Sequence, residues 1–208
     1  MPGDLQMLWR AKDPKAYHVE YRYSCVGYEI AGALGVKMAA PDREVFSLVG
    51  DGSYLMMAQE IVTAVSENVK LTVVIVQNHG YASIGDLSEK LGSQRFGTSY
   101  RCRNHETGLL NGGKLPLDLA ANAESLGADV IRVKTIDEFR AALARARQST
   151  RTTAVHIETD PLAPIPSSNG WWDVPVSQVA QLDSTQRARK TYESHQADQR
   201  LYITPAER

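Results

Sequence analysis

The sequence has little that would commit it to a membrane, a nucleic acid or an oxidising compartment. Its 208 residues carry 23 Lys and Arg against 24 Asp and Glu, and this balance argues against a surface for nucleic acid or anionic lipid. The two cysteines, Cys25 and Cys102, have neither the spacing of a zinc site nor that of a disulfide framework. No apolar run approaches the roughly 20 residues of a membrane span, and no signal peptide is evident. We therefore expect a cytoplasmic globular protein that binds neither nucleic acid nor membrane.

Short apolar segments alternate with helix-like patterns along most of the chain. The predicted strands are residues 44–49, 71–76, 130–133 and 153–158, and residues 17–21 could form another. The predicted helices cover residues 24–40, 55–65, 84–91, 116–126 and 135–146, the last opening on a Thr135–Glu138 capping box. Such alternation predicts parallel βαβ units, and hence an α/β fold in which helices cover both faces of a parallel sheet.

The composition changes beyond Asp160. Three prolines lead to Trp171 and Trp172, and a charged stretch at residues 176–202 is predicted to be helical with weak core-forming power. We therefore predict one domain over residues 1–160 and a Pro/Trp segment with a helical tail over residues 161–208. The tail has the character of a segment that docks on another surface, such as a second subunit of a homo-oligomer.

Two neighbouring predicted strands end in oxygen-bearing residues. Asp51 follows the first strand, and Asn78 and Gly80 follow the second. Carboxyl ends of parallel strands meet at one edge of a sheet, where α/β folds bind ligands. One carboxylate, one amide oxygen and one main-chain carbonyl supply half of an octahedral shell, which Mg²⁺ completes with phosphate oxygens and water. Backbone amides at Gly52, Ser53 and the start of the helix at 24–40 would suit a diphosphate.

Neither half of this arrangement is specific alone, because Asp-Gly-Ser is a common turn and Asn-His-Gly is equally ordinary. The pair is specific because one βαβ unit separates the two halves. It resembles the signature of thiamine diphosphate enzymes, a Gly-Asp-Gly followed by an asparagine at the end of the next strand. The resemblance implies a three-layer, Rossmann-like fold with thiamine diphosphate and Mg²⁺ as cofactors. Asp51, Asn78 and the Gly80 carbonyl would then bind the metal. Gln77 stands where the family usually has another asparagine.

The resemblance extends to further cofactor contacts. It implies contacts from the loop at Ser24, Cys25 and Val26, and from the residues around the metal, namely Gly50, Gly52, Ser53 and Tyr81. Val26 stands where relatives carry a bulky apolar residue that holds the cofactor bent, although simple core packing is the alternative. We expect Cys25 to pack against its neighbours or to contact the cofactor, and not to act as a nucleophile. His79 has two candidate roles, a contact to the substrate and a structural role.

Longer segments resemble one group within the family, the hydrolases that open a six-carbon cyclic 1,2-dione with water to give 5-deoxyglucuronic acid in inositol catabolism. The matching segments are residues 23–32, 49–57, 78–85, 96–98, 121–128 and 171–174. The implied substrate is a small cyclic dione. The alternatives are part of an acetolactate synthase or glyoxylate carboligase, against which the segments at 78–85 and 171–174 argue, and a non-catalytic truncated remnant.

Two features depart from the family pattern. Arg22 stands where relatives have a small glycine. Family members also carry an amino-terminal domain with the glutamate that activates the cofactor, and a middle domain, and neither is recognisable here. Glu20 and Glu29 are not in the matching place, so no residue is assigned a catalytic role. We expect a fragment that lacks its first strand, is inactive alone, and needs the missing domains or a second chain that carries them.

Overall fold

The computed structural model describes residues 2–20, 22–163 and 173–199. The chain divides into two compact units. One comprises residues 1–82 and 100–165, and the other comprises residues 83–99 and 166–208. The predicted Trp171–Trp172 element lies outside the described residues.

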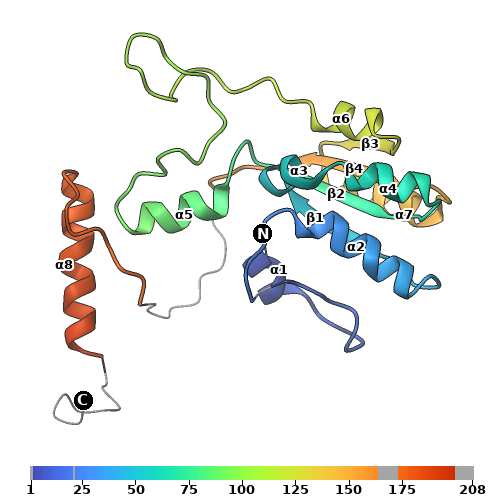
Figure 1. The fold of residues 1–208 in the computed structure, drawn as a ribbon, viewed down its shortest axis with the longest axis horizontal. Helices are drawn as coiled ribbons and strands as arrows, with labels where there is room; N and C mark the ends of the chain where they lie inside the picture. Colours follow the sequence, from blue (N-terminus) through green and yellow to red (C-terminus); the bar gives the residue numbers. More distant parts are fainter. Residues whose placement is uncertain (1, 21, 164–172, 200–208) are drawn as a thin grey trace. The chain divides into compact units, whose positions relative to one another are not determined.

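The first unit is built on a four-stranded parallel sheet (Figure 1). Its strands, in spatial order, are β1 (Phe46–Gly50), β2 (Thr72–Gln77), β4 (Thr153–Glu158) and β3 (Asp129–Val133). Gly50 pairs with Val76, so β1 and β2 end at the same level. The predicted parallel α/β fold is confirmed.

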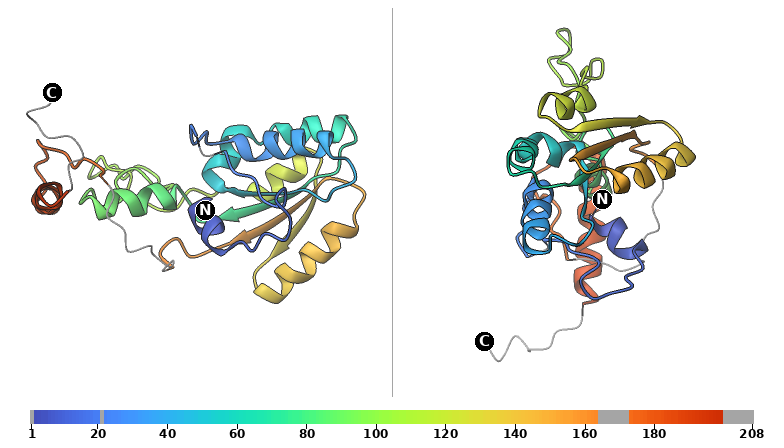
Figure 2. Two further views of the ribbon diagram at one scale, coloured as in Figure 1. Left: turned by 90° about the horizontal axis from the view of Figure 1, so that it is seen from below. Right: turned by 90° about the vertical axis from the view of Figure 1, so that its right-hand side faces the viewer.

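Helices cover both faces of this sheet, as Figure 2 shows. One face carries α2 (Tyr28–Ala39), α3 (Asp51–Met57), α4 (Glu60–Ser66) and α6 (Leu119–Ser125). The opposite face carries α7 (Ile136–Gln148). A short helix, α1 (Pro2–Leu8), precedes all of these elements in the sequence. The Thr135–Glu138 capping box is present at the start of α7.

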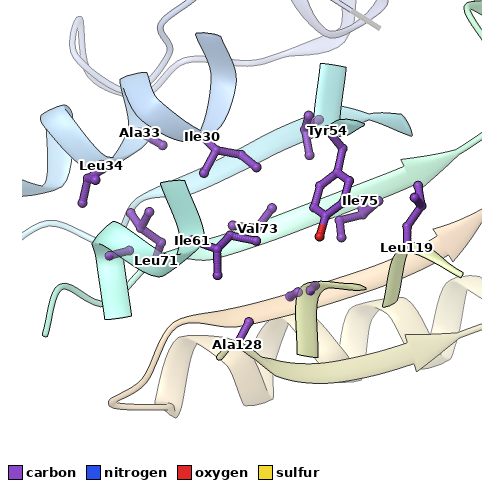
Figure 3. Close-up of a cluster of buried hydrophobic side chains, with 14 residues drawn as sticks. Ile30, Ala33, Leu34, Tyr54, Ile61, Leu71, Val73, Ile75, Leu119 and Ala128 are labelled. Atoms are coloured by element: carbon purple, nitrogen blue, oxygen red, sulfur yellow. The ribbon is translucent and has the colours of Figure 1, made fainter. Parts of the chain in front are cut away.

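The larger core lies between the sheet and α2, α3, α4 and α6 (Figure 3). Side chains alternate along β2: Val73 and Ile75 enter this core, and Val76 packs on the α7 side. Tyr54 is fully buried, and its hydroxyl donates to Asn122 Oδ1 at 2.8 Å. This bond joins α3 to α6 and thereby fixes α3, which begins at Asp51.

Three local expectations are wrong. The helix predicted from residue 24 begins at Tyr28, because Ser24 (φ 50°) and Gly27 (φ 98°) adopt left-handed conformations that a helix does not admit. The helix predicted after β1 is divided into α3 and α4 around Ala58 and Gln59. Residues 17–20 form no strand.

The second unit contains α8 (Asp183–Ala197) and most of α5 (Ala82–Lys90). The Ser184 and Thr185 hydroxyls donate to the Gly92 carbonyl at 2.7 and 2.9 Å, which ties the start of α8 to the segment after α5. The predicted tail helix is therefore present, though shorter than residues 176–202. Among the helices described, none has the length and apolar character needed to cross a bilayer.

Candidate functional site

The candidate site is built around the buried carboxylate of Asp51, at the start of α3. Asp51 Oδ2 accepts the backbone N–H of Asn78 at 3.2 Å and that of Gly80 at 3.0 Å. Its Oδ1 accepts the N–H of Gly52 at 3.1 Å. Burial raises the pKa of Asp51, and the backbone hydrogen bonds, that of Gly80 foremost, partly oppose this rise. The carboxylate thus ties the loop after β2 to the end of β1.

The Asp51 carboxylate, the Asn78 side-chain amide and the Gly80 carbonyl meet at one point. The end of the Asn78 amide lies 2.9 Å from the Gly80 carbonyl oxygen and 3.2 Å from Asp51 Oδ1. With its nitrogen at that end, the amide donates to both oxygens, and with its oxygen there, three acceptors converge with no proton between them. The second orientation is the one that a bound cation would require.

The spacing of these oxygens suits Mg²⁺. Octahedral Mg²⁺ has oxygen ligands at about 2.0–2.1 Å, which places neighbouring ligands about 2.9 Å apart. The two separations of 2.9 and 3.2 Å are close to this value. In the described part of the chain, no three His, Cys, Asp or Glu side chains are placed so that they could hold a metal ion together.

Gly52 lets an aromatic ring lie directly on the first turn of α3. A Cβ at Gly52 would come within 2.5 Å of the Tyr81 ring. Tyr81 meets Tyr100 edge to face with ring centroids 5.6 Å apart, and burial raises the pKa of Tyr100, with the Tyr81 hydroxyl adding to the rise. Gly50 has open space where a Cβ would stand, and Ser53 is half-buried in the same turn.

The loop before α2 is held by two carboxylates. Glu20 accepts the backbone N–H groups of Tyr23 at 3.0 Å and Cys25 at 2.9 Å, and Glu29 accepts that of Gly27 at 3.1 Å. These amides, expected to suit a diphosphate, are therefore already engaged, as is that of Gly52. Neither glutamate was predicted to have this role.

The loop nevertheless presents its side chains outward. Ser24 and Cys25 are exposed, and Val26 is 46% exposed, so the core-packing alternative for Val26 is wrong. Partial desolvation and the charge of Glu20 raise the pKa of the Cys25 thiol, which disfavours the nucleophilic thiolate.

Helix α3 joins this loop to the oxygen cluster. A Cβ at Gly27 would meet Met57 at 2.8 Å and Met56 at 3.1 Å, so the loop adjoins the end of α3. Asp51 is at the other end, roughly 9 Å away by the rise of a helix. The structure thus places the predicted residues in two groups at the two ends of one short helix.

Sequence reasoning missed a polar network at the carboxyl ends of β2 and β4. Gln77, His156 and Glu158 lie there with His79. The available signal was the occurrence of polar residues at the ends of otherwise apolar strands, and it was used only for Asp51 and Asn78.

Comparison with known proteins finds a family model and relatives that match most of the chain. A family model described as "Thiamine pyrophosphate enzyme, C-terminal TPP binding domain" matches residues 2–157. The chain is 41% identical over 202 residues to 3D-(3,5/4)-trihydroxycyclohexane-1,2-dione hydrolase 2 of Bacillus cereus. It is 40% identical over 202 residues to the corresponding hydrolase of Bacillus anthracis. Each match covers 97% of this chain and 31% of the relative, so the chain spans less than a third of their length.

Two solved structures are similar at 25% sequence identity. The thiamine diphosphate-dependent 4-hydroxybenzoylformate decarboxylase of Rhodococcus jostii RHA1 superposes with a TM-score of 0.53, covering 65% of this chain and 23% of that one. The benzoylformate decarboxylase of Polynucleobacter necessarius superposes with a TM-score of 0.51, covering 66% and 24%.

Proposed function

This chain belongs to the thiamine pyrophosphate enzyme family, whose C-terminal cofactor-binding domain it carries, and we propose that it supplies the thiamine diphosphate- and Mg²⁺-binding part of a hydrolase that opens a trihydroxycyclohexane-1,2-dione. The close approach of the Asp51 carboxylate, the Asn78 side-chain amide and the Gly80 carbonyl, within 2.9 and 3.2 Å of one another, supports the metal site most directly. The 41% identity to a dione hydrolase supports the reaction class.

In this proposal the oxygens of Asp51, Asn78 and Gly80 would hold Mg²⁺, whose positive charge would stabilise the cofactor's diphosphate at this site. Asp51 contributes the only negative charge of the set, and its hydrogen bonds to Asn78 and Gly80 hold the loop in the binding arrangement. When bound, thiamine diphosphate supplies a nucleophilic carbon and an electron sink for cleavage of a carbon–carbon bond. The exposed Val26 would support the cofactor from the loop that Glu20 and Glu29 hold in place.

We assign no proton-transfer role to a residue of this chain. The relatives are more than three times as long as the matched part, and we propose that ring opening requires domains corresponding to that remainder, including the group that activates the cofactor. The isolated chain is proposed to bind cofactor without turning over the dione.

Calorimetric titration of the chain with thiamine diphosphate tests the cofactor site. We expect binding that requires Mg²⁺ and is lost in Asp51→Ala. Asp137→Ala is the control, because Asp137 is an exposed carboxylate that pairs with Arg140 on α7, and it should bind like the unmodified chain. No binding by the unmodified chain, or equal binding by Asp51→Ala, would contradict the proposal.

A chimera tests the reaction class. The matched third of the B. cereus hydrolase would be replaced by this chain, and dione consumption would be measured with thiamine diphosphate and Mg²⁺ present. Ring opening that disappears in the Asp51→Ala chimera supports the hydrolase assignment. A folded, cofactor-loaded chimera that forms acetolactate from pyruvate and leaves the dione intact would favour a carboligase.

A further inference from the structure

Four side chains form a hydrogen-bonded chain beside the candidate metal site. His156 Nε2 lies 2.7 Å from Gln77 Oε1, and Gln77 Nε2 lies 3.3 Å from His79 Nδ1. His79 Nε2 lies 3.2 Å from Glu158 Oε2. We call this set the Gln77 network. Gln77 and His156 are 2% and 7% exposed, so water cannot readily replace their partners.

The direction of every hydrogen bond in the network follows from one neighbour. Gln77 Nε2 lies 3.4 Å from the carbonyl oxygen of Leu117, which can only accept. The amide nitrogen must therefore face Leu117, and Oε1 must face His156. His156 then donates from Nε2, and His79 Nδ1 accepts the second proton of the Gln77 amide. His79 consequently carries its proton on Nε2 and donates it to Glu158.

The network acts on the backbone that presents the metal-binding oxygens. His79 stands between Asn78 and Gly80 and adopts φ 61°, a left-handed conformation that a residue with a Cβ adopts only at a cost. Its carbonyl accepts the N–H of Tyr100 at 2.9 Å, and its ring is bonded on both nitrogens. The ring can turn only by breaking a bond to Gln77 or Glu158, so the network holds the strained turn in place.

We propose that Gln77 is a positioning residue for the metal site, acting through His79 to hold the Asn78–Gly80 turn in the arrangement that gathers its oxygens. The inference rests on the proposed cofactor site. The inference gives a role to position 77, where the family resemblance leads one to expect asparagine. The shorter asparagine side chain would not span the distance between His156 and His79.

The first test is the tautomeric state of the two histidines in the full chain, read from ¹⁵N–¹H correlation spectra of the imidazole rings at neutral pH. We expect both His156 and His79 to carry the proton on Nε2. Gln77→Met keeps the length of the side chain but removes its polar atoms. In this variant the His79 signals should no longer show the Nε2–H tautomer alone. A single Nδ1–H state of His79 in the unmodified chain would overturn the network.

The second test is Mg²⁺ affinity, measured calorimetrically with the full chain at a fixed concentration of thiamine diphosphate. Loss of a partner behind a metal ligand typically weakens binding by roughly 10- to 100-fold, and we expect Gln77→Met to fall in this range. Thr72→Val is the matched control. Thr72 is fully buried in the same strand, its hydroxyl bonds to nothing described, and it lies roughly 16 Å away.

His79→Asn guards against a general folding defect in Gln77→Met, because asparagine tolerates left-handed φ without making the same side-chain bonds. We expect it to weaken Mg²⁺ binding comparably, and the double variant should bind no more weakly than the weaker single variant. Independent, multiplying losses would overturn the linkage. Unaltered binding by Gln77→Met, with the unmodified chain binding normally, overturns this inference alone. No binding by the unmodified chain overturns the proposed function as well.

Discussion

The carboxylate of Asp51 accepts the backbone N–H of Gly80 at 3.0 Å, across 29 positions of sequence. The bond exists because β1 and β2 end side by side, so that the first turn of α3 meets the loop after β2. The same carboxylate faces the Asn78 amide. The Asp51 side chain thus makes a structural hydrogen bond and is also a candidate metal ligand. Small changes around it should therefore affect both stability and metal binding.

Replacing Asn78 by Asp should make the fold depend on Mg²⁺. The change places a second carboxylate about 3 Å from Asp51, and we expect repulsion to cost roughly 1–4 kcal/mol without metal. Mg²⁺ should restore more stability to Asn78→Asp than to the unmodified chain, as seen by thermal unfolding with and without the ion. Asn122→Asp controls for an added charge, since Asn122 accepts from Tyr54 and an aspartate can do the same. An Asn78→Asp variant insensitive to Mg²⁺ would count against the site.

Replacing Gly52 by Ala should displace Tyr81. The new Cβ would lie 2.5 Å from the Tyr81 ring, and we expect a loss of about 1–3 kcal/mol in unfolding free energy, measured by urea denaturation. Gly50→Ala is the matched control, because nothing lies within 4 Å of its Cβ position and its φ of −76° suits alanine. Adding Tyr81→Ala should recover part of the loss in Gly52→Ala, and equal losses in both glycine variants would refute the steric argument.

Stability should fall as the pH drops below about 6.5, in part because of His156. Burial lowers its pKa, Arg132 and His79 act in the same direction, and Glu158 and Asp118 oppose them. The unfolded chain therefore takes up this proton at a higher pH than the folded chain. The contribution of His156 to the free energy of unfolding is complete above the unfolded-state pKa of about 6.5. Below that pH it declines by at most about 1.4 kcal/mol per pH unit.

This pH effect is measured by thermal unfolding between pH 5 and 7.5. His156→Gln should flatten the profile in that range, and His105→Gln, which alters an exposed histidine, should leave it as it is. An unchanged profile in His156→Gln would show that other groups cause the dependence.

Asp118→Ala should loosen the start of α6. Asp118 caps this helix by accepting the N–H of Ala121 at 2.9 Å, and it pairs with both terminal nitrogens of Arg132 at 2.8 and 3.0 Å. The arginine and the cap together lower the pKa of Asp118 to about 2. The cap is worth about 1 kcal/mol, while the exposed ion pair adds little.

The two contributions of Asp118 can be separated. Asp118→Asn keeps a good cap and removes the charge, so it should unfold nearer to the unmodified chain than Asp118→Ala in the same denaturant series. Because the folded pKa is lowered, the stabilisation by the carboxylate is present above pH 3.8 and is lost as the pH falls towards 2. Equal losses in both variants would assign the effect to charge alone.

Local patterns predicted well what depends on local interactions. The strand at residues 153–158 and the capping box at Thr135 and Glu138 are as expected, because apolar β-branched runs and reciprocal caps are stabilised by near neighbours in sequence. The helix expected from residue 24 starts at Tyr28. The residues before Tyr28 instead belong to a loop whose backbone N–H groups donate to Glu20 and Glu29. Helical periodicity does not reveal this arrangement.

The sequence by itself determined the α/β class and the two strand ends that carry Asp51 and Asn78, because apolar alternation and the spacing of one βαβ unit are properties of the linear chain. Only the tertiary structure decided which oxygens face one another there. It also brought His156 from β4 and the Leu117 carbonyl against Gln77, which sets the direction of the hydrogen bonds behind the site. Such bonds depend on the order of strands in the sheet, and the order β1-β2-β4-β3 arises from packing between distant segments.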